Sequence, residues 1–315
     1  MARYRVSIDF SEPNDSRVTA LTGVPARSLV LDIGVGDGSV GRTLRQMGCR
    51  VFGVEMDESL AAGAADAYEH VVVADAERLD PSQAFSGMRF DVVLLLDVLE
   101  HLRNPEEVLA RIRSVLADRG FVIVSVPNIT HAAVKLQLLD GRFTYTEEGL
   151  LDSTHVHVFD IASLTALFAA TGFEIMELDR VTRPPEATEI PVDLGAVPPG
   201  VIEAVRSDPE AETYQFVATA APAGSRALVE PLLLPARILQ ARVRELAAER
   251  DALVGGGGRP WLNPPTISWI DEQVEQLRLR SEGHRQAIWD LLSSFRETSQ
   301  KLSEQIALLG DQPER

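Results

Sequence analysis

The residues with the clearest chemical potential lie in one short stretch, where an acid is followed by alternating glycines. They are Asp32, Gly34, Gly36 and Gly38. The apolar run 29–31 before them is typical of a buried strand, and the stretch 39–47 after them has apolar residues at helical spacing. Glycines in such a strand–turn–helix unit allow a positive φ and a close approach of a ligand to the backbone. The N-terminus of the helix adds free N–H groups and the positive end of a dipole.

Two classes of ligand fit this turn. A dinucleotide site requires G-x-G-x-x-G, which Gly36, Gly38 and Gly41 match. A site for S-adenosylmethionine resembles D-x-G-x-G-x-G, which the stretch from Asp32 to Gly38 matches in full. An acid at the end of the strand would repel a pyrophosphate but would attract a cationic amino group. The stretch therefore favours S-adenosylmethionine over NAD.

Acids also follow the next apolar runs of the chain. Glu55 closes the run 50–55, about twenty residues beyond the glycines, where a nucleotide-binding unit places a carboxylate for ribose hydroxyls. Asp75 follows the run 71–74 and would suit an adenine amine, and Asp97 follows the run 90–96. Ligands of parallel sheets bind at the carboxyl ends of the strands, so these acids and Asp32 are expected in one crevice. Met56 either packs beside adenine or belongs to the core.

The elements that would position these acids alternate between strand and helix. Arg119–Gly120 is predicted as a turn that leads into a strand at 121–126. A helix at 161–171 and strands at 173–178 and 213–219 follow, with 183–208 as a loop or lid. Such alternation predicts an α/β fold with a doubly wound, mostly parallel sheet.

The stretch 130–159 interrupts the alternation and contains candidate catalytic residues. His155 and His157 alternate with valines, which predicts an extended segment with both histidines on one face and Val156 and Val158 in the core. A hydroxyl nucleophile needs a general base, and a histidine near neutral pKa serves that role. We expect His155 to be the base, with Asp152 orienting one imidazole. His101, beside Glu100, is the second candidate.

Composition excludes several other classes of protein. The chain has 315 residues, 45% of them hydrophobic, and a net charge of −17, which argues against nucleic acid or an anionic membrane as the main partner. No apolar run reaches the length of a membrane span, and the first residues lack the apolar core of a signal peptide. The single Cys49 excludes an internal disulfide framework. These features predict a cytoplasmic protein.

The composition changes after residue 222, which divides the chain into a domain at 1–222 and a helical tail at 223–315. Gly255 to Gly258 is a flexible break within this tail. Apolar residues keep a heptad register with interruptions over 271–309. This pattern favours a coiled coil and homo-oligomerisation through the tail over a helix that packs on the domain.

From about residue 14 to 181 the chain resembles class I S-adenosylmethionine-dependent methyltransferases. The motifs concerned are LDIGVGDG, VFGVEMD, ADAERLD, FDVVLLLDVLEHL and GFVIVSVPN. The resemblance implies a Rossmann-like sheet of seven strands whose last strand is antiparallel. It implies that Asp32 and the glycines hold the methionine end of the cofactor, Glu55 the ribose and Asp75 the adenine amine, with Asp97 to His101 beneath the reactive methyl. The D-x-T-H element at 152–155 resembles a bacterial subgroup associated with polysaccharide or glycoconjugate biosynthesis.

A second resemblance concerns the DVLEH element. Small-RNA 2′-O-methyltransferases and ubiquinone-pathway O-methyltransferases have a similar E-x-x-E-H element that, with a later histidine, binds a divalent metal. Asp97, Glu100 and His101 match it, with Asp replacing the first Glu, and His155 or His157 could complete the site. Such ligands suit Mg, Mn or Zn. Many metal-free methyltransferases also contain an EHL sequence, so a metal is not the favoured interpretation.

The leading functional expectation is methyl transfer from S-adenosylmethionine to a hydroxyl of a sugar or glycan. The alternatives are a natural-product or quinone-type small-molecule O- or N-methyltransferase, and a catalytically silent assembly protein of the same fold. The intact glycines and acids count against silence. A dehydrogenase is the least favoured class.

Overall fold

The computed structural model describes residues 8, 12, 14–195, 197–233, 237 and 241. The chain divides into two compact units, Met1–Ala247 and Ala248–Arg315. The predicted coiled coil and glycine break lie outside the described residues. The domain boundary expected after residue 222 stays a prediction, although Val229 and Leu233 beyond it are buried in one of the apolar clusters of the sheet. Among the described residues, no helix combines the length and apolar character needed to cross a bilayer.

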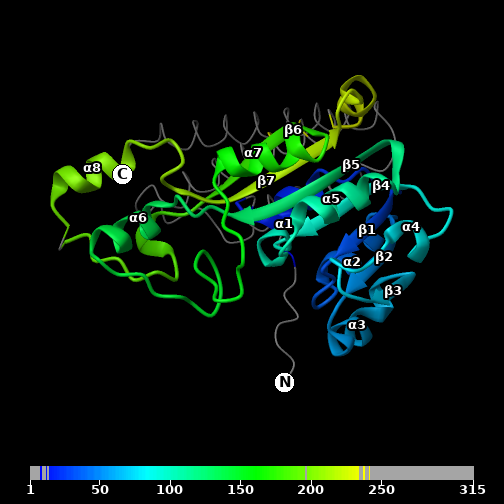
Figure 1. Cartoon of the computed structure of the whole chain (residues 1–315), viewed down its shortest axis with the longest axis horizontal. Helices are drawn as coiled ribbons and strands as arrows, with labels where there is room; N and C mark the ends of the chain where they lie inside the picture. The colour runs from blue at the N-terminus through cyan, green and yellow to red at the C-terminus, as the bar shows by residue number, and fades with distance from the viewer. Residues whose placement is uncertain are drawn as a thin grey trace, which may run out of the picture. The chain divides into compact units, whose positions relative to one another are not determined.

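The domain is built on one seven-stranded sheet with the strand order β3-β2-β1-β4-β5-β7-β6 (Figure 1). The strands are β1 (Leu29–Ile33), β2 (Arg50–Glu55), β3 (His70–Val73), β4 (Phe90–Leu96), β5 (Leu116–Pro127), β6 (Phe173–Thr182) and β7 (Thr213–Pro222). Strands β1 to β5 pair in parallel, whereas β7 pairs antiparallel with both β5 and β6. This confirms the predicted fold class, including the antiparallel last strand.

The predicted strands β2 and β4 match the structure at both ends, whereas β5 begins earlier than expected. The Arg119–Gly120 pair, predicted as a turn, lies inside β5, and the pairing with β4 shifts register there. A Cβ on Gly120 would stand 2.7 Å from the carbonyl oxygen of Phe90. The glycine therefore marks a bulge where two backbones approach closely, which has the same sequence pattern as a turn.

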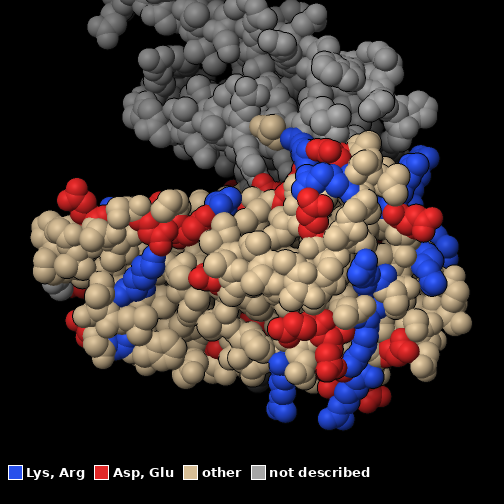
Figure 2. All heavy atoms as spheres, turned by 45° about the horizontal axis from the view of Figure 1, so that its top comes forward, with Lys and Arg blue, Asp and Glu red and all other residues tan. Residues whose placement is uncertain are grey.

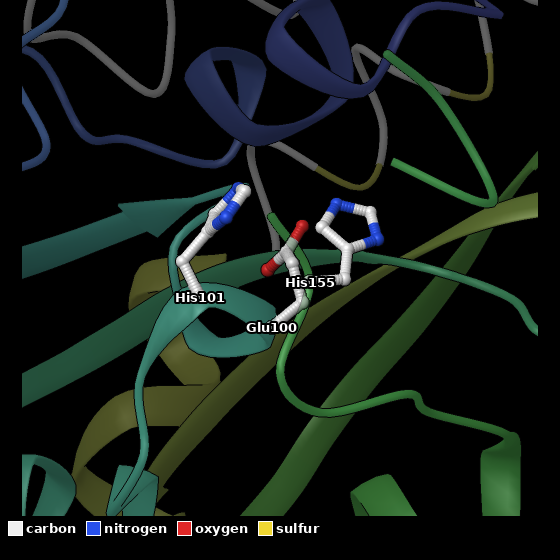
Figure 3. A group of neighbouring side chains, drawn as sticks. All are labelled: Glu100, His101 and His155. Atoms are coloured by element: carbon white, nitrogen blue, oxygen red, sulfur yellow. The ribbon is translucent and has the colours of Figure 1, made fainter. Parts of the chain in front are cut away.

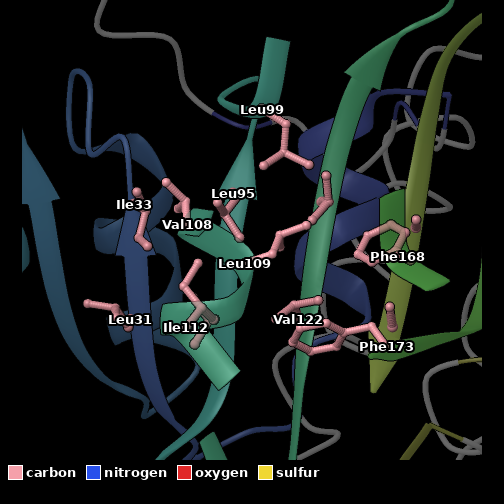
Figure 4. Packing of buried hydrophobic residues seen from close by; sticks show 14 of the residues in the cluster. Leu31, Ile33, Leu95, Leu99, Val108, Leu109, Ile112, Val122, Phe168 and Phe173 are labelled. Carbon is pink, nitrogen blue, oxygen red and sulfur yellow. The ribbon is translucent and has the colours of Figure 1, made fainter. Parts of the chain in front are cut away.

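Helices cover both faces of the sheet. One face packs against α1 (Ser16–Thr22), α2 (Ser39–Gln46) and α3 (Glu58–Ala64), and the other against α4 (Pro81–Ala84), α5 (Pro105–Arg113) and α7 (Ile161–Ala170). Adjacent residues of β1 pack on opposite faces of the sheet. Val30 belongs to the apolar cluster that includes residues of α1 and α2, and Leu31 and Ile33 belong to the cluster that includes residues of α5 and α7. Figure 4 shows Leu31 and Ile33 beside Leu109 and Ile112 of α5, with Phe168 of α7 farther along the sheet. Burial on both faces explains the continuous apolar runs.

The segments that break the alternation gather beyond the carboxyl end of β5 (Figure 1). They include α6 (Ala132–Leu139), the short helix η3 (Pro185–Ala187) and α8 (Pro199–Arg206). The loop or lid predicted at 183–208 is therefore partly helical. Leu136 of α6 and Val205 of α8 belong to one small apolar cluster, which orders this part of the chain.

Truncating the centre of the sheet should destabilise the domain strongly. Leu94 of β4 is fully buried, so Leu94→Ala should lower the free energy of unfolding by about 2–5 kcal/mol. Leu139→Ala is the matched control, because that side chain is 65% exposed and its loss should change stability by less than about 0.5 kcal/mol. Chemical denaturation of both variants tests this; equal effects would contradict the described core.

Candidate active site

Two pockets lie at the carboxyl end of the sheet. The glycine-loop pocket, of about 550 Å³, is lined by Asp15 to Arg17, Asp32, Gly34 to Asp37, Ser39, Val40, Leu96, Asp97, Glu148, Gly149, Arg183, Glu189, Tyr214 and Gln215. The Glu55 pocket, of about 640 Å³, is lined by Ile33, Gly34, Val54 to Met56, Ala74 to Arg78, Asp97, Val98 and His101 to Asn104. Gly34 and Asp97 line both. The four acids expected at the strand ends therefore meet in one continuous region.

The glycine loop follows β1 closely. Gly34 has a φ of +85°, and a Cβ there would stand 2.7 Å from the Val98 side chain. Gly38 has a φ of +78° and occupies the N-cap position of α2 without a capping side chain. Any other residue at either position would be strained. The loop thus leaves the backbone of the helix N-terminus open to the glycine-loop pocket.

Glu55 connects β2 to this loop. Its Oε2 accepts a hydrogen bond from the backbone N–H of Gly36 at 3.0 Å, and its Oε1 accepts one from Asp57 N–H at 3.0 Å. Asp57 itself caps α3 by accepting hydrogen bonds from the N–H groups of Ser59 and Leu60. The carboxylate is therefore held in place before any ligand binds.

Asp32 is nearly inaccessible, with 2% of its surface exposed. The Tyr68 hydroxyl donates a hydrogen bond to its Oδ2 at 2.5 Å. Burial raises the pKa of the Asp32 carboxyl to about 7; the hydrogen bond from Tyr68 opposes this shift and the charge of Glu55 adds to it.

The adenine-side candidates lie in the Glu55 pocket. Met56 is 73% exposed, so the interpretation of this residue as part of the core is wrong. The alternative, in which Met56 packs beside adenine in the Glu55 pocket, stays a prediction. Asp75 accepts a hydrogen bond from Glu77 N–H at 2.9 Å and lies 3.5 Å from the Arg78 guanidinium. It is both a turn residue and part of the pocket wall.

Asp97 has a left-handed backbone conformation with a φ of +55°, which is unusual for a residue with a side chain. Its N–H donates to the Ser125 hydroxyl oxygen at 3.0 Å, and its Oδ1 accepts from Ser125 Oγ and Gln215 Nε2, both at 2.7 Å. Desolvation at the floor of the crevice raises the pKa of Asp97, and the bond from Ser125 opposes that. Two neighbouring strands therefore hold this acid where both pockets meet.

A second group of side chains lies beside Asp97. Glu100, His101 and His155 bring one carboxylate oxygen and two ring nitrogens within 4.8 Å of one another, and Figure 3 shows them turned toward one another. The imidazole rings of His101 and His155 are 4.9 Å apart. Glu100 is 1% exposed, and in the described part of the chain its Oε2 has no hydrogen-bond partner. Asp97, the fourth predicted metal ligand, is not part of this group.

Burial sets the protonation of this group. It raises the pKa of Glu100 well above the ordinary value, with a further contribution from the charge of Asp97. It lowers the pKa of His155, and the neighbouring His101 lowers it further while Asp152 opposes. His155 is therefore a neutral imidazole near pH 7.

Asp152 contacts the histidines differently from the prediction. Its Oδ1 accepts the hydroxyl and the N–H of Thr154, both at 2.7 Å, and Thr154 Oγ1 lies 3.1 Å from His101 Nδ1. Because the hydroxyl proton is used on Asp152, we infer that His101 Nδ1 donates, which leaves Nε2 as its acceptor. Asp152 thus orients His101 through Thr154, and acts on His155 through its charge.

His157 has a different environment from His155. Its Nε2 lies 3.1 Å from the carbonyl oxygen of Arg103. The expectation that Val156 and Val158 point into the core is wrong, because they are 55% and 56% exposed. The segment is attached instead by its backbone: the N–H groups of Val156 and His157 donate to the Glu100 carbonyl at 2.8 and 3.0 Å. The alternation of histidine and valine therefore does not mark a buried face, because the backbone of this segment is bonded to the turn that contains Glu100.

Several wall residues were not anticipated from the sequence. Thr154 is the third residue of the D-x-T-H element and Ser125 lies in the GFVIVSVPN motif, so both could have been found from the sequence. Arg17 and Gln215 have no motif around them. Arg17 lies on the short helix α1 and lines the glycine-loop pocket. Only the pairing of β5 with β4 and β7 brings Ser125 and Gln215 to Asp97.

The charge of the surface is mixed on the face that Figure 2 shows, where basic side chains stand close to acidic ones. Ion pairs among the described residues include Arg50 with Glu69 and Arg180 with Glu210. The expectation that nucleic acid is not the main partner, drawn from the net charge of −17, stays a prediction.

Comparison with known protein families identifies the domain. Residues 10–178 match a family model described as a methyltransferase domain. The chain belongs to this family. The fold is that of a class I S-adenosylmethionine-dependent methyltransferase domain, and at this level the expected enzyme class and cofactor are confirmed.

The curated relatives are bacterial ubiquinone biosynthesis O-methyltransferases. That of Azorhizobium caulinodans is 32% identical over 167 residues, which cover 50% of this chain and 65% of the relative. That of Pseudomonas aeruginosa strain UCBPP-PA14 is 33% identical over 117 residues, or 36% of this chain and 50% of the relative. The chain thus spans only half to 65% of these relatives' lengths.

Solved methyltransferase structures are also similar to this chain. Magnesium protoporphyrin IX methyltransferase from Synechocystis PCC 6803 with bound SAH has a TM-score of 0.46 and 19% identity, covering 70% of this chain and 90% of that one. A Burkholderia thailandensis 1,6-didemethyltoxoflavin-N1-methyltransferase has a TM-score of 0.44 and 20% identity, covering 66% and 76%.

The raised pKa of Asp32 predicts a pH dependence of stability without cofactor. The folded state holds this proton up to about pH 7, whereas the unfolded chain releases it near the ordinary value of 3.8. The stabilisation is complete below the unfolded value and is lost as pH rises toward 7, by roughly 4 kcal/mol. In the Asp32→Asn variant this component should disappear.

The measurement is urea denaturation at several pH values between 4 and 8, comparing the wild type with Asp32→Asn. The other titrating groups contribute equally to both proteins, so the difference between the two pH profiles reports the contribution of Asp32. Parallel pH profiles for the two proteins would contradict a buried, proton-holding Asp32.

Proposed function

We propose that this protein transfers the methyl group of S-adenosylmethionine to an acidic hydroxyl, such as a phenol or enol, of a small molecule. The observation behind this proposal is the group of Glu100, His101 and His155, of which His101 lines the Glu55 pocket together with Asp97. It puts neutral histidine next to the residues that would hold the cofactor.

The cofactor would bind across both pockets. Asp32 and the loop around Gly34, Gly36 and Gly38 would hold the methionine end, since a buried carboxylate suits an ammonium and the positive end of the α2 dipole suits a carboxylate. Glu55 would hold the ribose hydroxyls, and Met56 and Asp75 the adenine side. Asp97 would lie beneath the reactive centre.

The chemistry then depends on alignment and on proton removal. The sulfonium methyl is already electrophilic, so the protein mainly orients the acceptor for in-line attack. His155 would accept the hydroxyl proton, and the relay from Asp152 through Thr154 would keep His101 oriented beside it. His157, with its ring nitrogen on a backbone carbonyl, would hold the segment rather than react.

The lowered pKa of His155 favours an acidic hydroxyl as acceptor. A weak base takes a proton more readily from a phenol, whose pKa is about 10 in tyrosine, than from an aliphatic sugar hydroxyl. The curated relatives point the same way, because they are named as ubiquinone biosynthesis O-methyltransferases. The sugar or glycan acceptor expected from the sequence is therefore the less supported one.

The same three side chains would fit a divalent cation. One carboxylate and two imidazoles suit Mn or Zn, and the buried Glu100 Oε2 without a partner among the described residues is a ready ligand. A bound cation would lower the pKa of a coordinated hydroxyl. Glu100, His101 and His155 would hold it, with Asp97 outside the set.

Removing Glu55 should weaken cofactor binding. A charge-assisted contact to ribose hydroxyls is worth roughly 1.5–3 kcal/mol, so Glu55→Ala should raise the dissociation constant about tenfold or more. Glu55→Gln keeps an acceptor for the glycine loop but loses the charge, so its dissociation constant should lie between those of the wild type and Glu55→Ala. Calorimetry with S-adenosylhomocysteine measures this, with the exposed Glu58→Ala as the matched control. Unchanged affinity in Glu55→Ala would remove Glu55 from the site.

Removing His155 should affect turnover instead. A lost general base typically costs 10²–10⁴-fold in rate, so His155→Ala should lose about that much kcat on a dihydroxybenzene acceptor with cofactor affinity little changed. The readout is S-adenosylhomocysteine formation. His70→Ala is the control, because His70 begins the edge strand β3, whereas the histidine group follows the carboxyl end of the central strand β4.

Two comparisons complete this test. Turnover of His155→Ala within about threefold of wild type would exclude it as the base and leave His101 as the candidate. If a chelator abolishes wild-type turnover and Mn²⁺ or Zn²⁺ restores it, His155 acts as a ligand. Activity on sugar nucleotides but not on phenols would overturn the proposed acceptor class.

A further inference from the structure

Tyr68 is a buried side chain that the proposed chemistry does not use. It follows the short helix η1 (Ala65–Ala67) and is 4% exposed. Its hydroxyl accepts a hydrogen bond from the backbone N–H of Gly41 at 3.2 Å and donates one to Asp32 Oδ2 at 2.5 Å. A single hydroxyl therefore connects helix α2 to the acid at the end of β1.

This hydroxyl takes the place of a helix cap. The N-cap residue of α2 is Gly38, which has no side chain to bond the free N–H groups of the first turn. Tyr68 supplies the missing acceptor to Gly41, the third residue of the helix, from another part of the chain. The positive end of α2 is thereby brought, through one O–H group, to the Asp32 carboxylate.

Two glycines make room for this ring. A Cβ on Gly41 would stand 2.4 Å from the Tyr68 ring, and one on Gly53 would stand 3.1 Å from it and 2.4 Å from Val35. Gly41 is the residue that completes the match to the dinucleotide pattern. Its lack of a side chain is explained by the tyrosine that crosses it, so the sequence around α2 is built to admit Tyr68.

We propose that Tyr68 is a positioning residue of the cofactor site: its hydroxyl orients Asp32 and favours the ionised form that the ammonium group of the cofactor requires, and cofactor binding displaces the proton from those molecules in which Asp32 is still protonated. This inference rests on the proposed function, in which Asp32 holds the methionine end. Asp32 has no other hydrogen bond from a side chain in the described part of the chain.

The protonated and ionised forms of Asp32 are close to equal in population near pH 7. With a carboxyl pKa of about 7, roughly half of the cofactor-free molecules hold the proton at pH 7. Protonated Asp32 presents no charge to an ammonium. The ionisable groups that act on Asp32 directly are Tyr68 and Glu55 of β2. Of these, Glu55 is the group whose charge raises the pKa of Asp32. The wall of the glycine-loop pocket contains further ionisable side chains: Asp15, Arg17, Asp37, Asp97, Glu148, Arg183, Glu189 and Tyr214.

The test is calorimetry with S-adenosylhomocysteine between pH 6 and pH 8. The wild type should bind about tenfold more weakly at pH 6 than at pH 8, and at pH 7 should release about half a proton per molecule bound. In Tyr68→Phe the ring still fills its place but the O–H is gone, so the midpoint of the pH dependence of affinity should move up by about one or two pH units. Affinity at pH 7 should then fall about five- to fiftyfold.

Tyr145→Phe is the matched control, since Tyr145 is 62% exposed, and it should keep the wild-type profile. A Tyr68→Phe profile that coincides with wild type would overturn the inference. If that variant does not fold, proton release by the wild type decides: none at pH 7, measured in buffers of different ionisation enthalpy, overturns the inference.

Asp32→Asn separates this inference from the proposed function. If Asp32→Asn binds as tightly as the wild type with the same pH profile, the placement of the methionine end at Asp32 fails. If Asp32→Asn loses binding while Tyr68→Phe is unaffected, that placement survives and only the role of Tyr68 is overturned.

Discussion

The active site depends on burying carboxyl groups at the edge of a sheet without leaving them uncompensated. An ionised group withdrawn from water is costly unless donors surround it or a proton neutralises it. Glu55 meets this constraint with two backbone N–H groups, Asp32 with the Tyr68 hydroxyl, and Asp97 with Ser125 and Gln215. Glu100 meets it only by a raised pKa. Glu55, Asp32 and Asp97 are therefore oriented by hydrogen-bond donors, whereas Glu100 has one carboxylate oxygen without such a donor among the described residues.

The parts that follow from short-range rules were predictable. Strands β2 and β4 match their predicted ends because a strand buried on both faces must be apolar throughout. The four acids at strand ends could be placed in one crevice because parallel strands share a carboxyl edge. The glycines were predictable for a related reason, since Gly34 and Gly38 have backbone angles that other residues avoid.

The parts that depend on distant contacts were not predictable. Nothing near Gln215 indicates that antiparallel pairing of β7 with β5 brings it to Asp97. Alternation in the segment 154–159 indicated a buried valine face, but the segment is held by backbone bonds to Glu100 and leaves the valines exposed. Gly120 was taken for a turn because a bulge and a turn require the same residue.

The attachment of the segment 156–157 to one carbonyl has a consequence for how acceptor preference could diversify. The N–H groups of Val156 and His157 both donate to the Glu100 carbonyl oxygen, which ties the chain directly after His155 to the η2 turn (Leu99–His101). Asp152 and Thr154 tie the chain before it to His101. Residues 141–145, between α6 and Thr146, are exposed and make none of these bonds. In the proposed function, a change of length or composition there would leave His155 in place, so this exposed stretch is where acceptor preference would vary.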